Sequence, residues 1–239
     1  MFDNLEALDS RRHGELTYHP VADYRFAQQV TSAPLAISEC QQAARCFPVV
    51  FAKGDTGVSP VALLSMRKGD NPFVDSEGQW RADYLPAHLR RYPFILGETD
   101  EQGRFWVMID RQAPHFEGDE GEPLFVDGQE PENGVVQRAK TFLVNFEKEL
   151  RQTRELLKPL DTHGVLVERQ FTVNQAGKQE VAVRGFYMVD EEKLKALDDA
   201  TLAKWVRSGL MGLITGHLQS LDNANRLLRL QQRETAAVD

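Results

Sequence analysis

The chain has 239 residues, with 28 Lys and Arg against 36 Asp and Glu, a formal net charge of −8, and 41% hydrophobic residues. This is enough for one large domain or two small ones with a real core. No apolar run approaches the roughly 18 to 20 residues that cross a bilayer, and residues 1–13 hold no apolar signal core. We therefore expect a soluble, cytoplasmic protein that would reach a cell surface only by a signal-independent route. The acidic balance argues against nucleic acid as a partner, because binding phosphates requires clustered Lys and Arg.

The distribution of prolines divides the chain into two parts. Ten of the eleven prolines lie in the first 131 residues. We expect a turn-rich α+β part over 1–131 and a helix-hairpin-helix part over 132–239, packed into the same single domain. The predicted fold class is α+β, with a mixed or antiparallel sheet built from hairpins and packed against two long helices of the C-terminal half.

Two stretches of the first part share one layout. Residues 47–53 and 60–66 are short apolar runs around a Gly-containing loop and predict a hairpin that follows a helical piece. About 45 residues later, residues 82–110 repeat the order of helical piece, aromatic-Pro pair, strand, polar loop and strand. An internal duplication and a chance likeness both remain open. A duplication would place the two hairpins in one sheet, with each helix covering part of its face.

The second part begins with an amphipathic pattern that predicts a helix over 134–158, ended by Pro159. Residues 165–173 and 180–189 predict a third hairpin, which we expect to join the sheet of the first part. A last helix is expected from Asp198 or Asp199 to about residue 219 or, after a break near Asn223, to about residue 230. It carries a row of small residues that would let another helix or a sheet approach closely: Ser208, Gly212, Gly216 and Ser220.

The usual motifs of catalysis and cofactor binding are absent from the sequence. There is no G-x-S-x-G, no Gly-rich phosphate loop and no zinc-binding spacing, so no cofactor is evident. His13 and His19 are weak candidates for a metal site, together with Asp9, Glu15 or Asp23, against the more usual capping and surface roles. The apolar stripe of the last helix indicates a core role for His217 with a hydrogen bond to a carbonyl. Cys40 and Cys46 are expected to be buried structural thiols.

Residues 80–94, which we call the Arg/aromatic segment, are the richest stretch for binding. Arginines beside Trp and Tyr rings can hold a carboxylate, a phosphate or a planar ligand by bidentate hydrogen bonds and stacking. The alternative is that the arginines tie a helix to a strand through internal Asp or Glu partners. The candidate ligand-binding residues are Trp80, Arg81, Tyr84, His88, Arg90, Arg91 and Tyr92.

The sequence resembles the bacterial SapC-like family, whose name is linked to a cell surface layer. The likeness covers nearly the whole chain, and its most specific part is W-x3-Y-x-P-x3-RRYPF (80–94). Elsewhere, family members often have Glu-Phe where this chain has Glu39-Cys40. The matching stretches are RRH (11–13), DYRFA (23–27), P-L-x-x-x-E-C (34–40), FPVVF (47–51), DNPFVDSEGQW (70–80), DYLPAHLRRYPF (83–94), GFYMVDEEKLKAL (185–197) and GHLQSLDN (216–223). The resemblance implies a surface-layer association but no catalytic residue. It does not extend to the peptide-permease component of the same name, which spans the membrane several times.

These observations favour a non-catalytic binding or accessory protein with the Arg/aromatic segment as its functional surface. The alternatives are an enzyme acting on a small molecule or peptide, in a pocket lined by His88, Arg90, Arg91 and nearby aromatics, and a structural envelope protein that assembles through its helical face. The expected partner is a small anion, a peptide or a protein, and a homo-oligomer stays open. Residues 98–132 hold 11 acidic and two basic residues, which indicates either a solvated region or a docking face for a basic partner.

Overall fold

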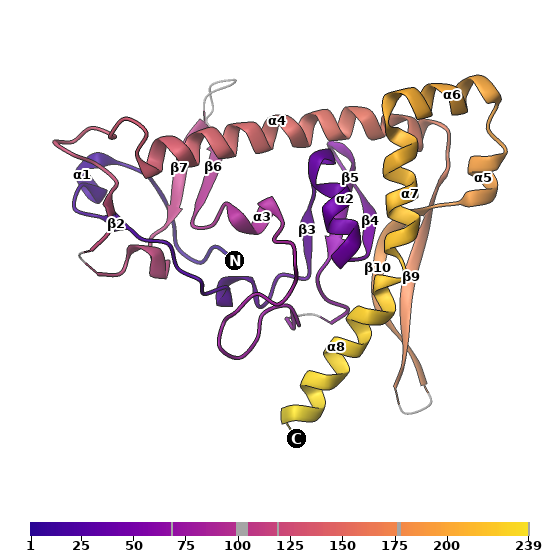
Figure 1. Cartoon of the computed structure of the whole chain (residues 1–239), viewed down its shortest axis with the longest axis horizontal. Coiled ribbons are helices and arrows are strands. Elements are labelled where there is room, and N and C mark those ends of the chain that lie inside the picture. The colour runs from indigo at the N-terminus through magenta and orange to yellow at the C-terminus, as the bar shows by residue number, and fades with distance from the viewer. Residues whose placement is uncertain (68, 99–104, 119, 176–177, 239) are drawn as a thin grey trace.

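The computed structural model describes residues 1–67, 69–98, 105–118, 120–175 and 178–238. All strand pairs in it are antiparallel, and together with the helices they confirm the predicted α+β class. Its main helices and strands are arranged as shown in Figure 1. The helices are α1 (Ser10–His13), α2 (Ile37–Cys46), α3 (Ala87–Arg90), α4 (Val135–Thr162), α5 (Glu191–Lys195), α6 (Asp199–Ser208), α7 (Leu210–Ser220) and α8 (Asn223–Val238), with short 3₁₀ turns at Arg25–Ala27 and Pro114–Phe116.

The strands of the described residues form three sheets. A five-stranded sheet has the order β3 (Ser32–Pro34), β5 (Gly57–Leu63), β4 (Val49–Gly54), β10 (Lys178–Val189), β9 (Leu166–Gln175). A three-stranded sheet has the order β1 (Leu5–Ala7), β7 (Phe105–Asp110), β6 (Phe94–Glu98). The third is the pair β2 (Thr17–Tyr18) and β8 (Glu122–Pro123).

The three predicted hairpins are confirmed, but the first two do not share one sheet, as the duplication would have placed them. The hairpins β4–β5 and β6–β7 each follow a helix, α2 and α3, yet they belong to different sheets. A short strand from earlier in the chain pairs with the second strand of each hairpin. These pairs are β3 with β5 and β1 with β7. The hairpins therefore do not pair with each other. The third hairpin, β9–β10, joins the sheet of β4 and β5 as expected.

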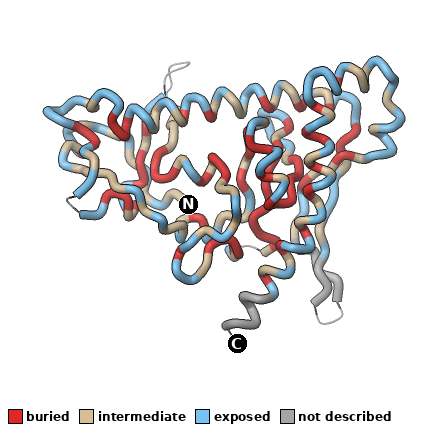
Figure 2. Tube along the Cα trace, viewed as in Figure 1, coloured by how far each residue is buried: buried red, intermediate tan, exposed pale blue. Residues whose placement is uncertain are grey.

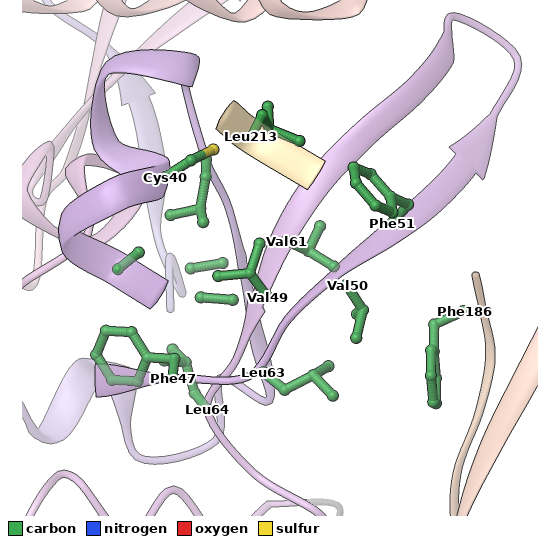
Figure 3. Packing of buried hydrophobic residues seen from close by; sticks show 14 of the residues in the cluster. Cys40, Phe47, Val49, Val50, Phe51, Val61, Leu63, Leu64, Phe186 and Leu213 are labelled. Carbon is green, nitrogen blue, oxygen red and sulfur yellow. The ribbon is translucent and has the colours of Figure 1, made fainter. Parts of the chain in front are cut away.

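Two hydrophobic cores lie along the molecule. The larger core combines buried residues of 27–89 with buried residues of 157–227, and the smaller core is formed by residues between Tyr92 and Leu143. Figure 3 shows part of the larger core, where side chains of α2, β4 and β5 meet Leu213 of α7 and, on the other side, Phe186 of β10. Figure 2 shows that the most continuous buried segments lie in this part of the molecule. The proposed division of the chain at residue 131 stays a prediction.

The long helix α4 runs along both cores (Figure 1). Its first turns place Val136 in the smaller core and its last turns place Leu157 and Leu160 in the larger core. The prediction that Pro159 ends the helix is wrong, because α4 continues to Thr162. A proline removes one N–H near the end of a helix, and burial of Leu157 and Leu160, both 0% exposed, outweighs that loss.

The last helix is divided more than the sequence indicated. Its start at the cap Asp198 and its break near Asn223 are confirmed, but a further break at Gly209 separates α6 from α7. Gly209 has φ +83°, the left-handed conformation typical of a residue that ends a helix.

The row of small residues on the last helix was predicted to let another element approach closely, and only part of the row does so. Ser220 approaches β4 closely, and its hydroxyl accepts a hydrogen bond from the Val49 N–H at 2.9 Å. A methyl group at Gly212 or Gly216, however, would meet no atom of a neighbouring element within 4 Å. These two glycines line a groove of about 660 Å³ between α2 and α7.

Candidate binding site

Glu39 connects α2 to the Arg/aromatic segment. It lies in the first turn of α2, where its Oε2 accepts a hydrogen bond from the Ala36 N–H at 3.1 Å. Its Oε1 accepts two further bonds of 2.6 Å, from the Tyr84 hydroxyl and from the Ala87 N–H that begins α3. The guanidinium of Arg90 lies 3.7 Å from the same oxygen. The buried carboxylate is therefore fully hydrogen-bonded and next to a cation, as a buried charge requires.

Three further predicted site residues also have internal partners. Arg81 forms an ion pair with Asp75. Trp80 donates from Nε1 to the Tyr84 carbonyl at 2.9 Å and packs on the larger core. The hydroxyl of Tyr92 lies 3.3 Å from the buried carboxylate of Asp110. These contacts hold the loop residues of 75–84 together and link Tyr92 to the end of β7.

Arg91 differs from the other arginines of the segment. It is half-buried, its Nε is fully buried without a hydrogen-bond partner, and no carboxylate of the described residues lies within ion-pair distance of it. Its guanidinium lies over the Phe2 ring, 5.6 Å from the centroid. Burial lowers the pKa of Arg91, and the charge of Glu147 offsets this only in part. The charge of Arg91 is thus partly desolvated and has no direct counterion.

His88 lies close enough to Arg91 to be affected by its charge. Burial, followed by the charge of Arg91, lowers the pKa of His88 to about 3. The imidazole is therefore neutral at pH 7 and carries one N–H that can donate a hydrogen bond.

The structure thus brings Tyr84 and Arg90 together at Glu39 and places His88 beside Arg91. Internal partners are confirmed for Arg81 and Arg90, whereas Arg91 has none among the described residues. The segment's role in ligand binding stays a prediction. The sequence did not indicate Glu39 as the central residue, because its contacts with residues 84 and 87 span 45 and 48 positions.

The two weak metal candidates do not share a site. His13 is buried, with its Nδ1 accepting from the Asp9 N–H at 3.1 Å and its Nε2 3.4 Å from Glu6. His19 instead lies near His115, and the Nδ1 atoms of both are buried without a partner. In the part of the chain that the structure describes, no three His, Cys, Asp or Glu residues are placed to hold a metal ion.

His217 has the core role that the sequence indicated. It is 1% exposed, and its Nδ1 lies 2.6 Å from the Val49 carbonyl while its Nε2 accepts from the Val189 N–H at 3.2 Å. The ring thus bridges β4 and β10. Burial lowers its pKa to about 4, so the neutral tautomer with the proton on Nδ1 satisfies both strands.

The described hollows are not lined by residues of the Arg/aromatic segment. Besides the groove between α2 and α7, one hollow lies on the five-stranded sheet and another, of about 570 Å³, lies beside the start of α4. None of these three is lined by a predicted site residue. The sequence could not reveal these hollows, because a sequence pattern does not show which face of a sheet the helices leave uncovered.

The acidic stretch 98–132 is partly neutralised by α4. Glu122 forms an ion pair of 2.6 Å with Arg138, and Glu130 forms one of 2.5 Å with Lys140. Residues 99–104 and 119 lie outside the described residues. A docking role for the stretch stays a prediction.

The geometry defines an α+β protein whose Arg/aromatic segment is built into the joint between two cores. The model of the SapC family matches residues 8–227, and the chain belongs to this family. Neither the comparison with curated proteins nor that with solved structures found a match. Among the described residues, no helix has the length and apolarity of a membrane span.

Proposed function

We propose that this protein is a non-catalytic binding or accessory protein that holds an anionic oxygen-bearing group of its ligand at Arg91. The observation that carries the proposal is the half-buried guanidinium of Arg91, which has no acceptor among the described residues. A desolvated charge without a partner generally lowers the stability of the folded protein by several kcal/mol. Its presence in the fold therefore requires an explanation. A ligand carboxylate or phosphate would supply the missing acceptor.

The surroundings of Arg91 favour an anion over other ligands. His88 is neutral and offers a donor, while Arg90 is already engaged with Glu39. Glu147 acts on Arg91 only through its charge, beyond ion-pair distance. The charge of Arg91 is therefore left without a direct counterion, next to the Phe2 ring that lies under the guanidinium.

The enzyme alternative receives less support from the same residues. With a pKa of about 3, His88 would be a weak general base and cannot act as an acid near neutral pH. Burial also raises the pKa of the nearby Cys40 thiol to about 12, so it would not supply a thiolate nucleophile. Binding without chemistry fits these groups better.

The family resemblance implies a link to a cell surface layer. The proposal therefore includes a partner that belongs to that layer. Assembly through an apolar helical face is less favoured. Among the described residues, the large exposed hydrophobic side chains on helices are only Val144 of α4 and Val206 of α6. Single exposed apolar residues are normal on protein surfaces.

Separate substitution of the arginines tests the proposal. Titration of the labelled protein with inorganic phosphate, followed by the amide signals of residues 87–94, should show binding in the wild type and in the control Arg81→Gln. Arg91→Gln should lose this response while keeping or gaining stability, because it removes an unpaired charge. Arg90→Gln should lose about 1 kcal/mol of stability, since it leaves Glu39 without its cation. Loss of stability in Arg91→Gln without any loss of phosphate binding would sink the proposal.

A further inference from the structure

The hollow on the five-stranded sheet has a volume of about 380 Å³, and its described lining residues lie on strands and loops. On β4, Val49 and Phe51 contact His217 of α7, so the alternation of the strand turns Ala52 toward the opposite face. The hollow therefore lies on the sheet face away from α7. Four neighbouring strands contribute to its lining, among them Ser32 of β3, Ala52 of β4, Val61 and Leu63 of β5, and Phe186 of β10.

An irregular stretch of β10 borders this hollow. The register of β10 against β9 shifts between Val181 and Val183 and again between Val183 and Phe186. Gly185 within it has φ +77°, and a Cβ there would meet nothing within 4 Å. Bulges bend a strand and re-aim its side chains, and they are over-represented beside functional sites. Here the irregularity lines the hollow directly through residues 183–186.

The chemistry of the lining is apolar with positive charge. Ala52, Val61, Leu63 and Phe186 contribute apolar surface. Among the lining residues that the structure describes, the charged ones are Arg67 and Arg184, and none is Asp or Glu. Arg184 is exposed, so its guanidinium can reach a ligand without breaking a buried contact. The volume falls within the range of about 300 to 1,000 Å³ that is usual for small-molecule pockets.

We propose that this hollow binds a small molecule with an apolar body and one carboxylate group. The apolar body lies on the sheet against Phe186, and the carboxylate accepts hydrogen bonds from Arg184, a geometry for which guanidinium groups are well suited. This site is independent of Arg91, so either proposal can fail without the other.

Decanoate and decanol, which share an apolar chain and differ in the carboxylate, provide the test with the full-length protein. Titrations followed by the amide signals of residues 183–186 should show that the wild type binds decanoate about tenfold more tightly than decanol. Arg184→Gln should remove this difference by weakening decanoate alone. The control Arg169→Gln, on the neighbouring strand β9 and outside the lining, should keep it.

Two filling variants test the location. Ala52→Phe should abolish binding of both probes by filling the hollow, and Thr31→Trp at the rim serves the same purpose if the first variant is unfolded. Equal affinities for decanoate and decanol, an unchanged preference in Arg184→Gln, full binding in a folded filling variant, or no binding of decanoate at all would each overturn the proposal.

Discussion

At the scale of single residues, Glu39 is the most heavily used polar group of the candidate site. Its carboxylate joins the start of α2, the start of α3 and Tyr84, which are distant in sequence. Burial and the hydrogen bond to Glu39 raise the pKa of the Tyr84 hydroxyl, which keeps it a donor over the physiological range. Glu39 thus fixes the middle of the Arg/aromatic segment, from Tyr84 to Arg90.

Replacing Glu39 should lower the free energy of unfolding, because Glu39 holds α2, α3 and Tyr84 together. Glu39→Gln keeps the shape but turns an N–H₂ group toward backbone and hydroxyl donors, and it leaves Arg90 unpaired. We expect a loss of about 3 kcal/mol in the free energy of unfolding, measured with urea. The control Glu155→Gln, which removes an exposed pair with Lys158, should change stability by less than about 0.5 kcal/mol. Equal effects in the two variants would contradict the central role of Glu39.

Buried histidines should make the protein sensitive to mild acid. The pKa of His217 falls from 6.5 to about 4 on folding. Below pH 6.5 the unfolded chain binds a proton that the folded chain does not, so the contribution of His217 is complete above that pH and is lost as the pH falls. By pH 4 the loss should reach about 3 kcal/mol.

A variant distinguishes the contribution of His217 to this pH dependence from the contributions of the other histidines. In His217→Gln, the slope of unfolding free energy against pH between 6.5 and 4 should become shallower. A residual slope should remain, because burial also lowers the pKa of His115 to about 4 and that of His88 to about 3. An unchanged slope in the variant would show that His217 titrates normally in the folded protein.

The sequence predicted some of these residue roles and missed others for a physical reason. His217 was predictable because it lies on the apolar stripe of a helix, a local pattern. The grouping of Tyr84, Arg90 and Arg91 was also visible in one short stretch. Which arginine is paired was not visible, because it depends on Glu39, which approaches only when α2 and α3 pack together. The absence of a partner for Arg91 is likewise a property of the folded chain alone.

At the scale of elements, the glycines around α7 act in opposite ways. Gly209 needs its left-handed conformation to end α6, whereas Gly212 and Gly216 have helical surroundings and open space beside them. Gly209→Ala should therefore lower the free energy of unfolding by about 1 kcal/mol. Gly212→Ala should raise it by up to about 1 kcal/mol, because alanine favours the helix. Urea unfolding of the two variants provides the check, and destabilisation by Gly212→Ala would mean that the groove closes on α7 in solution.

The hairpins were the elements that the sequence predicted best. Their apolar runs and their turn residues are adjacent in the chain, so the pairing of β4 with β5 is a local matter. The sheets that the first two hairpins join were not evident from the sequence, because β1 and β3, which lie beside β7 and β5, are only three residues long each and give little signal. The break at Gly209 was missed because a glycine among other small residues looks like part of a helix face.

At the scale of the whole molecule, α4 is the element common to the buried clusters. Leu143 belongs to the smaller core and Leu157 to the larger one, while Phe146 between them packs with Ala36 and Ala87. A continuous helix therefore couples the two cores mechanically. The helix α4 contacts β5 and α2 as well as β6.

A kink in the middle of α4 should uncouple the cores. Asn145 is exposed and lies between the contacts to the two cores. Asn145→Pro should cost about 3 kcal/mol or more and split a single calorimetric transition into two. Asn145→Ala, which keeps the helix, should retain one transition. A single transition in both variants would show that α3 and the loops couple the cores without α4.

The composition of the two cores has a consequence for synthesis on the ribosome. The smaller core uses residues up to Leu143, whereas the larger core needs α7 and residues up to Leu227 to cover strands made from residue 32 onward. The strand β4 receives its partner β10 only after more than 120 further residues, because β10 begins at Lys178. It receives the side chain of His217 later still, since His217 and Val49 are 168 positions apart. The N-terminal part of a chain is synthesised first and at a finite rate. The β4 edge of the hairpin β4–β5 therefore stays unpaired until β10 is made, while the smaller core can already form. During that interval the nascent chain exposes the β4 edge, which makes this strand the expected point of contact for a chaperone.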